Sequence, residues 1–262
     1  MASRGWSTAD IPDQTGRRLV VTGASSGIGR EAAAALARAG AQVTLAVRDE
    51  AKGRAAAAAM SGTVDVRRLD LADLASVRAF ADAWEGHLDV LVDNAGVMAT
   101  PERRTVDGFE LQLGTNHLGH FALTNLLLPR ITDRVVVVSS SAHRMGHIDV
   151  DDLNWERRRY RPWPAYSQSK LANLLFVRGL QRRLDAAGSP LRAVAAHPGY
   201  AATDLQRKTG NRFAATGMVL LNRLVAQSAA AGALPTLYAA VEDIPGGSYV
   251  GPDGWMEQRG RP

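Results

Sequence analysis

Short apolar runs rich in β-branched residues alternate along the chain with longer helix-like stretches, and this alternation constrains the fold most. The apolar runs are residues 19–21, 43–47, 64–66, 90–92, 135–138 and 193–196. Strands separated by helices form βαβ units, which place the strands in one parallel sheet. Because the run at 135–138 is apolar throughout, helices should cover both faces of the sheet. The sequence therefore predicts a doubly wound parallel sheet, a three-layer α/β/α Rossmann fold.

The stretches between the strands have the length and composition of helices. Helices are expected at residues 28–39, 50–60, 74–84, 109–128 and 167–184. The first should end at Gly40, a typical helix stop. Residues 248–252 are a candidate last strand. A length of 262 residues fits one α/β domain spanning residues 1–262.

Composition excludes several classes of protein. The chain contains no cysteine, which removes disulfides, thiolate nucleophiles and cysteine zinc sites. Residues 1–15 do not join a basic start to an apolar run, and no apolar stretch is long enough for a membrane span, so we expect a cytoplasmic protein. The formal charge of +5 comes from dispersed arginines, with one basic run at 157–161, and we expect no nucleic-acid partner.

A glycine-rich turn follows the first strand and leads directly into a helix. Segment 22–29 reads Thr-Gly-Ala-Ser-Ser-Gly-Ile-Gly. Glycines allow the backbone to approach a pyrophosphate, and the helix N-terminus offers free N–H groups to the anion. A plain Gly/Ser-rich turn is the alternative. The candidate cofactor-binding residues of this turn are Gly23, Ser25, Ser26, Gly27, Ile28 and Gly29.

A phenol and an ammonium group share one face of a predicted helix. Lys170 follows Tyr166 by one helical turn. A phenol with a pKa of about 10 is a poor base at neutral pH, and a nearby cation favours its ionised form. Tyr166 could then exchange a proton with a substrate oxygen, with Lys170 lowering its pKa. A solvated helical pair is the alternative.

In this order, these motifs resemble the short-chain dehydrogenase/reductase family. The resemblance implies that Tyr166 and Lys170 are catalytic and also touch the cofactor, and that Ser140, after the strand at 135–138, hydrogen-bonds the substrate oxygen. It also implies that Asn116 holds a water in a proton relay, although a structural amide that kinks the helix is the alternative. Ser139 and Ser141 could instead be strand-end caps.

The resemblance also assigns residues that follow other strands to the cofactor. Asp70 would meet the adenine amine, although it could be a helix N-cap beside Leu71. The family usually has a second asparagine where this chain has Asp93, which puts local support of the sheet in doubt. The further cofactor residues implied are Leu71, Asn94, Ala95, Gly96, Pro198, Gly199 and Thr203.

Cofactor preference follows from the end of the second strand. An enzyme that uses NAD places a carboxylate there, whereas this chain has Val47 followed by Arg48. A guanidinium can pair with a 2′-phosphate, so we expect NADP(H) to be preferred, with NAD(H) as the alternative. Asp49 could reach the ribose or cap the following helix, and capping is favoured.

Four segments narrow the resemblance to the branch of retinol dehydrogenases, WW-domain oxidoreductases and protochlorophyllide reductases, as a bacterial member. They are 47–49, 116–121, 139–143 and 169–173. That branch carries extra residues between its serine and tyrosine, which matches an insertion at 142–165 here. The insertion is expected to form part of the rim of the substrate pocket. Its histidines are not expected to bind a metal.

The resemblance implies reversible NADP(H)-dependent hydride transfer between nicotinamide and the carbonyl or alcohol of a small apolar or aromatic molecule. Reduction of an activated C=C bond is one alternative. A non-catalytic dinucleotide-binding redox sensor is another, although such a protein would be expected to have lost its tyrosine or lysine. The resemblance also implies that the helices at 109–128 and 167–184 could pair in a homodimer or homotetramer.

Overall fold

The structure is a computed structural model that describes residues 5–199, 228–254, 257 and 260–262, and Thr203 lies outside these residues. Its described strands form one parallel sheet in the order β3-β2-β1-β4-β5-β6-β7. This arrangement confirms the predicted doubly wound sheet. The strands are β1 (Arg18–Thr22), β2 (Gln42–Val47), β3 (Thr63–Arg68), β4 (Leu88–Asp93), β5 (Ile131–Val138), β6 (Arg192–Ala196) and β7 (Tyr249–Val250).

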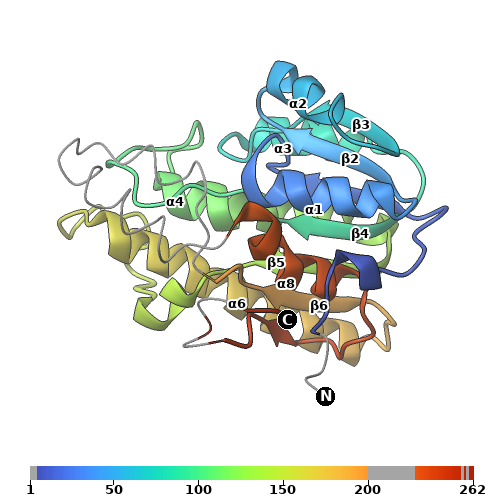
Figure 1. Cartoon of the computed structure of the whole chain (residues 1–262). Coiled ribbons are helices and arrows are strands. Elements are labelled where there is room, and N and C mark those ends of the chain that lie inside the picture. The colour runs from blue at the N-terminus through green and yellow to red at the C-terminus, as the bar shows by residue number, and fades with distance from the viewer. Residues whose placement is uncertain (1–4, 200–227, 255–256, 258–259) are drawn as a thin grey trace.

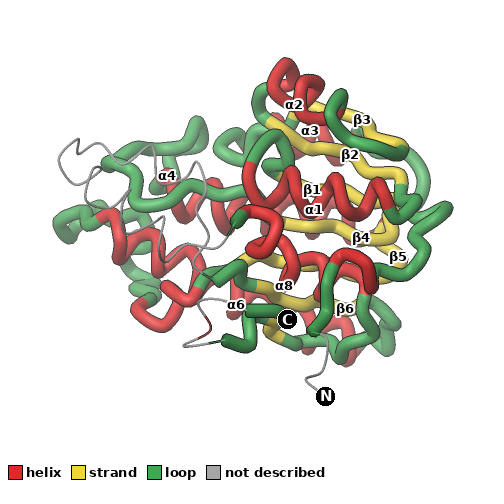
Figure 2. Tube along the Cα trace, viewed as in Figure 1, coloured by secondary structure: helices red, strands yellow, loops and turns green. Residues whose placement is uncertain are grey.

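Helices cover both faces of the sheet, as Figures 1 and 2 show. One face carries α1, α2 and α8, and the opposite face carries α3, α5 and α6. The α-helices are α1 (Gly27–Arg38), α2 (Glu50–Ala57), α3 (Leu74–Asp82), α4 (Leu111–Leu113), α5 (Gly119–Leu127), α6 (Pro162–Ala186) and α8 (Ala229–Val241). Short 3-10 or π turns are η1 (Thr8–Asp10), η2 (Gly114–Leu118), η3 (Leu128–Arg130) and η4 (Ser141–Met145).

The central strand β1 shows why its sequence is apolar throughout. Successive side chains of a strand point to opposite faces, so Val21 packs with α1 and Val20 packs with the helices behind the sheet. Both valines are fully buried. A strand in this position needs an apolar residue at every site. The core is therefore two layers, one on each face.

Two expected elements differ in the structure. The stretch 109–128 is interrupted, because a π turn, η2, separates α4 from α5 and is centred on Asn116. Helix α6 begins at Pro162, so the last residues of the predicted insertion 142–165 are helical. The candidate strand at 248–252 is present as β7, which pairs with β6.

The amino-terminal edge of the sheet is held by ion pairs. Asp133 accepts from Arg17 at 2.5 Å, Arg192 at 2.9 Å and Arg134 at 3.0 Å. Arg134, only 3% exposed, also donates from Nη1 to the carbonyls of Ala239 at 3.1 Å and Glu242 at 2.6 Å. These bonds join the starts of three strands to the end of α8.

Candidate active site

The glycine-rich turn packs against the residues that follow β4. Gly23 has φ +68°, and a Cβ there would lie 2.8 Å from the Cβ of Ala95. A Cβ on Gly29 would collide with the side-chain amide of Asn94. Any larger residue at these two positions would therefore push the turn away from the segment after β4.

The start of α1 lacks a cap from its own N-cap residue. Ser26 precedes α1 and makes no side-chain capping bond, whereas Asp49 caps α2 and Asp73 caps α3. The first N–H groups of a helix need an acceptor, which a bound phosphate can supply. The turn of Ser25, Ser26, Gly27 and Ile28 therefore fits the pyrophosphate of a dinucleotide.

Thr22, the last residue of β1, joins the turn to the residues after β4. Its hydroxyl accepts from the backbone nitrogens of Asn94 and Ala95, both at 2.9 Å. The side-chain amide of Asn94 donates to the Thr22 carbonyl at 2.8 Å. Gly96 follows, and a Cβ there would lie 3.1 Å from Oδ1 of Asn116. These hydrogen bonds join the end of β1 to the residues after β4, beside the predicted cofactor site.

Asp70 is not the cap of the following helix. Asp73 performs that role, while the Asp70 carboxylate accepts from the backbone nitrogen of Ala72 at 3.0 Å, in an Asx turn. Leu71 is buried at 6% exposure. The capping alternative for Asp70 is wrong, and its half-buried carboxylate lies after the end of β3.

Arg48 and Asp49, after the end of β2, have different environments: the Arg48 side chain is free to meet a ligand, and Asp49 caps α2. The Arg48 side chain is exposed and makes no ion pair with a described residue. Asp49 accepts from the backbone nitrogen of Lys52 at 3.1 Å, and this bond holds the pKa of Asp49 below its usual value. The favoured interpretation of Asp49 as a helix cap agrees with this geometry.

At the end of β6, Pro198 and Gly199 are half-buried, and Gly199 has φ +63°.

Tyr166 and Ser140 face each other between α6 and the end of β5. Tyr166 is 7% exposed, and its hydroxyl is close enough to that of Ser140 to influence its pKa. Burial raises the pKa of Tyr166, and the nearby Ser140 hydroxyl opposes that rise. The neighbouring Ser139 points elsewhere, since its hydroxyl donates to the Lys170 carbonyl at 2.8 Å. Of this pair, Ser140 is the one whose hydroxyl meets the phenol.

Lys170 lies deeper than the expected interaction with Tyr166 requires. Its Nζ donates to the Val138 carbonyl at 3.0 Å and lies 5.8 Å from the centre of the Tyr166 ring. Burial lowers the pKa of Lys170 to about 8. That Lys170 lowers the pKa of Tyr166 stays a prediction, since in the structure burial has the largest effect on the phenol and raises its pKa.

The side chain of Asn116 is fully engaged by the protein. Oδ1 accepts from the Val97 nitrogen at 2.7 Å, and Nδ2 donates to the Val97 carbonyl and to Ser169 Oγ, both at 2.9 Å. The interruption of the helix at η2 allows this pairing. The side-chain amide of Asn116 therefore has the structural role that was the alternative to holding a water. A water held by Asn116 would have to bind its main-chain carbonyl.

His120 lies within segment 116–121, and no role was predicted for it from the sequence. The His120 ring is 1% exposed, and its nitrogens meet the Asn116 carbonyl at 3.0 Å and the Thr22 hydroxyl at 2.9 Å. The signal was a histidine within an otherwise apolar helix, which needs buried partners.

Asp93, the departure from the family pattern, is accommodated without disrupting the sheet. It is 1% exposed and pairs in register with Val137. Thr124 donates to its Oδ2 at 2.8 Å, while Oδ1 has no hydrogen-bond partner among the described residues. Burial raises the pKa of Asp93 to about 8. A neutral carboxyl at this site resembles an asparagine in shape and leaves no buried charge.

Buried polar contacts anchor the insertion between Ser140 and Tyr166. The carboxylate of Asp152 accepts from three successive backbone nitrogens, and Arg158 lies 3.8 Å above the centre of the Trp155 ring. Arg158 also donates to Oε1 of Gln168 on α6 at 2.8 Å. These contacts give the insertion a defined conformation against α6.

Tyr160 and Trp163 are aromatic residues near the end of this insertion. The Tyr160 hydroxyl accepts from Gln112 at 2.8 Å and donates to Glu110 at 3.1 Å. Trp163 is 49% exposed, and its ring lies edge-on to Tyr166 with 6.1 Å between ring centres. An exposed indole beside the phenol provides an apolar wall next to the predicted reaction site.

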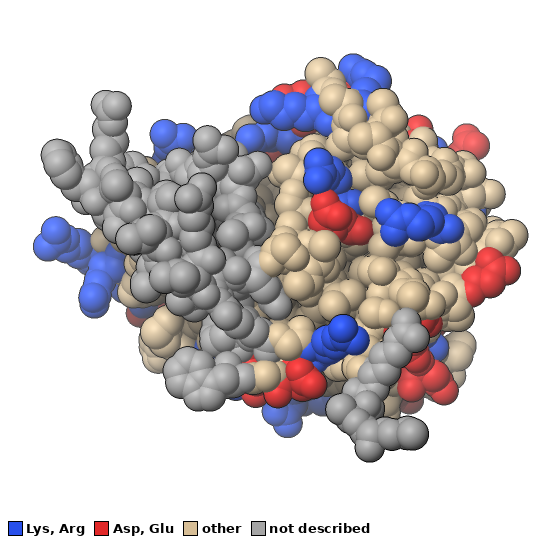
Figure 3. All heavy atoms as spheres, in the orientation of Figure 1, with Lys and Arg blue, Asp and Glu red and all other residues tan. Residues whose placement is uncertain are grey.

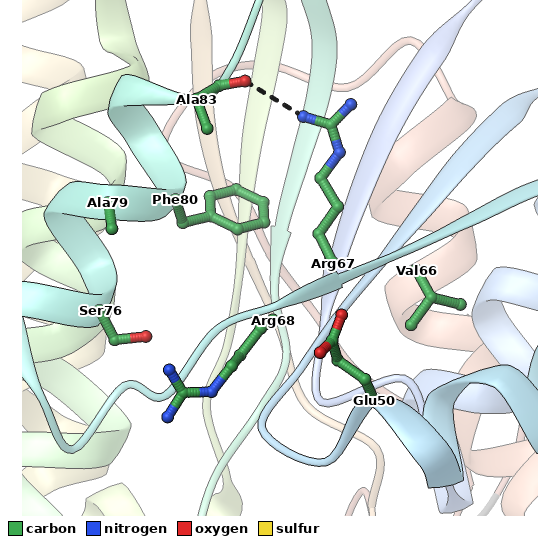
Figure 4. A pocket seen from close by; sticks show the side chains of 8 residues that line it. All are labelled: Glu50, Val66, Arg67, Arg68, Ser76, Ala79, Phe80 and Ala83. Carbon is green, nitrogen blue, oxygen red and sulfur yellow. Dashed lines mark hydrogen bonds between the residues drawn. The ribbon is translucent and has the colours of Figure 1, made fainter.

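A surface groove of about 340 Å³ lies elsewhere, at the outer edge of β3 (Figure 4). Arg67 crosses it and donates to the Ala83 carbonyl at 3.3 Å. The groove contains none of the predicted catalytic residues. Its lining is Glu50, Val66, Arg67, Arg68, Ser76, Ala79, Phe80 and Ala83.

On the face shown in Figure 3, lysines and arginines are interspersed with acidic residues. Across residues 5–199 and 228–254, no helix combines the length and apolarity needed to cross a bilayer.

The fold and the dinucleotide cradle define an NAD(P)-dependent oxidoreductase. The family model for short chain dehydrogenase matches residues 17–212, and the chain belongs to that family. It is an enzyme that acts on CH–OH groups.

Three similar proteins illustrate the match. Retinol dehydrogenase 13 of Homo sapiens is 45% identical over 252 residues, which are 90% of this chain and 75% of the relative. A crystal structure of an uncharacterized protein from Mycobacterium paratuberculosis is 58% identical, with a TM-score of 0.86 over 98% of this chain and 87% of that one. A short chain dehydrogenase from Shigella flexneri 2a, complexed with NADP, is 25% identical, with a TM-score of 0.69 over 90% of this chain and 97% of that one.

Proposed function

We propose that the protein transfers hydride reversibly between NADP(H) and the carbonyl or alcohol of a small apolar or aromatic molecule. The observation that carries this proposal is the pair of Tyr166 and Ser140 hydroxyls, which meet beside the exposed Trp163 ring. The relative named retinol dehydrogenase supports an apolar substrate. The exposed Arg48 supports NADP(H) over NAD(H).

The residues of this chain would divide the proton chemistry among them. The bound nicotinamide supplies or accepts the hydride. In the reducing direction, Tyr166 donates its hydroxyl proton to the substrate oxygen as negative charge develops there. Ser140 donates a second hydrogen bond to the same oxygen. Lys170, which is buried and has a lowered pKa, would bond the nicotinamide ribose.

Asn116 acts in this proposal by holding the site in shape. Its amide fixes Val97 and Ser169, one on the segment after β4 and the other on α6. Gly96 and Lys170 lie beside it, because a Cβ on Gly96 would be 3.1 Å from Asn116 Oδ1 and 3.7 Å from Lys170 Nζ. The residues for the adenosine half, Asp70, Leu71, Asn94 and Ala95, line the carboxyl edge of the neighbouring strands.

The proposal is tested by a panel of carbonyl compounds assayed through the loss of NADPH absorbance. The panel contains all-trans-retinal, decanal, an aromatic ketone and a small polar aldehyde. We expect turnover of the apolar members and little of the polar one. Product analysis distinguishes a C=O from a C=C reduction. NADPH binding without turnover of any compound would instead favour the redox sensor.

We also propose association into a homodimer or homotetramer through α5 and α6. Phe121 on α5 is 46% exposed and Leu175 on α6 is 52% exposed. The two helices are adjacent, since the rings of Phe121 and Phe176 lie 5.2 Å apart. Light scattering of Phe121→Asp against wild type tests this, and an unchanged mass for the variant would contradict it.

A further inference from the structure

His120 connects the two halves of the site through its two ring nitrogens. Nδ1 lies 3.0 Å from the Asn116 carbonyl, in the π turn that precedes α5. Nε2 lies 2.9 Å from the hydroxyl of Thr22, at the end of β1. The ring is 1% exposed, so it has no access to water as a substitute partner.

The partners of the ring determine its tautomer. The Asn116 carbonyl can only accept, so Nδ1 must carry the proton. Thr22 Oγ1 already accepts from two backbone nitrogens, which leaves its own proton to donate. Nε2 at 2.9 Å is a nearer acceptor for that proton than the Val92 carbonyl at 3.3 Å. His120 is therefore a donor on one side and an acceptor on the other.

Charged groups around the ring do not disturb this assignment. Burial is the main reason that the pKa of His120 is lowered to about 3; the bond to the Asn116 carbonyl raises the pKa, and Lys170 and His117 lower it. Asp93 is the nearest carboxyl, with Oδ1 4.0 Å from Nε2, and burial raises its pKa to about 8. At 4.0 Å this contact is too long for a hydrogen bond that could replace the bond to Thr22.

The two ring nitrogens of His120 belong to two different hydrogen-bond networks. Through Thr22, Nε2 reaches the backbone of Asn94 and Ala95, which are predicted to hold the adenosine half of the cofactor. Through Asn116, Nδ1 reaches the turn whose amide binds Ser169 on the helix that carries Tyr166. The imidazole is thus a rigid link between a cofactor wall and the catalytic helix.

We propose that His120 is a positioning residue whose two nitrogens hold two separable parts of the site: Nε2 the cofactor wall, and Nδ1 the π turn against the catalytic helix. The catalytic half of this proposal rests on the proposed function. The cofactor half does not, because it concerns NADPH binding alone.

Two conservative variants separate the nitrogens. In His120→Asn the amide nitrogen lies where Nδ1 lay, so the bond to Asn116 is kept and the bond to Thr22 is lost. In His120→Gln the amide group reaches the place of Nε2, so the bond to Thr22 is kept and the bond to Asn116 is lost. His87→Asn is the matched control, since that histidine has a side chain 53% exposed.

Titration of each variant with NADPH and turnover of decanal at saturating NADPH are the measurements. A buried polar group left without its partner costs enough to change an equilibrium by about tenfold. We expect His120→Asn to raise the NADPH Kd about tenfold with kcat nearly unchanged, and His120→Gln to lower kcat about tenfold with the Kd nearly unchanged. His87→Asn should change neither.

Equal changes of Kd and kcat in both variants would show a merely structural role and overturn the proposal, as would no change in either. Nitrogen NMR of the wild type gives an independent test, since the proposal requires the Nδ1–H tautomer and an Nε2–H tautomer contradicts it. This measurement decides the matter if the variants fail to fold. Absence of turnover by the wild type would count against the proposed function, whereas the NADPH titration would still test Nε2.

Discussion

The two edges of the parallel sheet use polar residues in opposite ways. At the amino-terminal edge, Asp133 is surrounded by Arg17, Arg134 and Arg192, and every charge has a partner. At the carboxyl edge, the polar groups between β5 and α6 are hydroxyls and a buried lysine. The hydroxyls of Tyr166 and Ser140 lie near each other, and Lys170 donates to a carbonyl with one of its three donors.

The paired charges at the amino-terminal edge stabilise the fold, whereas the groups at the carboxyl edge can take part in the reaction. Paired charges with satisfied hydrogen bonds hold strands and helices but have no capacity left for a ligand. The hydroxyls and the lysine at the carboxyl edge keep unused donors in a buried setting, where they interact most strongly with a charge that develops on a substrate. Substitutions at the two edges should therefore change different measured quantities.

The largest effect is expected for Tyr166→Phe at the carboxyl edge. General acid–base groups contribute about 10²–10⁴-fold, so kcat should fall at least about a hundredfold. NADPH affinity and thermal unfolding should stay near wild type, because only one hydroxyl is removed. Steady-state kinetics and NADPH titration measure this. Tyr238→Phe is the control, since that ring packs on Trp6. Turnover within about tenfold of wild type would remove Tyr166 from the acid–base role.

The opposite edge should respond in stability alone. Arg134→Met removes two bonds to the end of α8, while Asp133 keeps Arg17 and Arg192. We expect the free energy of unfolding to fall by about 2–4 kcal/mol, with kcat of the folded enzyme retained. Urea denaturation measures this against Arg54→Met, whose side chain is 65% exposed and whose loss should cost under about 0.5 kcal/mol. A loss of kcat without a loss of stability would contradict the separation of the two edges.

Arg48→Ala should affect the carboxyl edge through the cofactor alone. Hydrogen bonds to a charged group contribute about 1.5–3 kcal/mol, so NADPH binding should weaken by roughly ten- to a hundredfold. NADH binding should change little, because NADH lacks the 2′-phosphate. Both cofactors are titrated into wild type, Arg48→Ala and the control Arg54→Ala. Equal losses for the two cofactors, or a wild type that prefers NADH, would refute the assignment.

The effect of Asp93 should be seen only in the pH dependence of stability, because burial raises its pKa to about 8. The folded protein then holds a proton that the unfolded chain releases near pH 4, so this carboxyl makes the free energy of unfolding fall as pH rises from about 4 to about 8. The slope from one group is at most about 1.4 kcal/mol per pH unit. Asp93→Asn should remove this contribution.

Urea denaturation at several pH values measures the difference between wild type and Asp93→Asn. The profile of Asp93→Asn is subtracted from that of the wild type, because the lowered pKa values of Asp133 and Asp49 make the free energy of unfolding rise with pH in both proteins. Parallel pH profiles for the two proteins would show that Asp93 is ionised in the folded state. Activity at pH 7 should be similar, because both side chains are neutral and of the same shape.

The structure also changes how the insertion should be tested. Deletion of residues 149–161 would remove Asp152 and Arg158, and would leave Gln168 on α6 without its partner. A change in substrate preference after such a deletion could come from damage to α6. Trp163→Ala is a better variant for the rim, since its indole is half exposed and contacts Tyr166 only by its edge.

The sequence by itself determined the sheet, the family and the position of most site residues along the chain. Strand periodicity, helix caps such as Asp49 and the glycine-rich turn depend on neighbours a few residues away, so they can be seen in the sequence. The particular order of these motifs determined the family. Because parallel strands align their carboxyl ends, the residues after each strand could also be expected to meet.

Only the tertiary structure decided how the site residues are held. The interruption at η2 follows from bonds between Asn116 and Val97, and the tautomer of His120 follows from Thr22, 98 positions earlier in the chain. The pKa of Tyr166 depends on how deeply α6 buries it. These features come from pairs far apart in sequence and from exclusion of water, and local sequence patterns carry neither quantity.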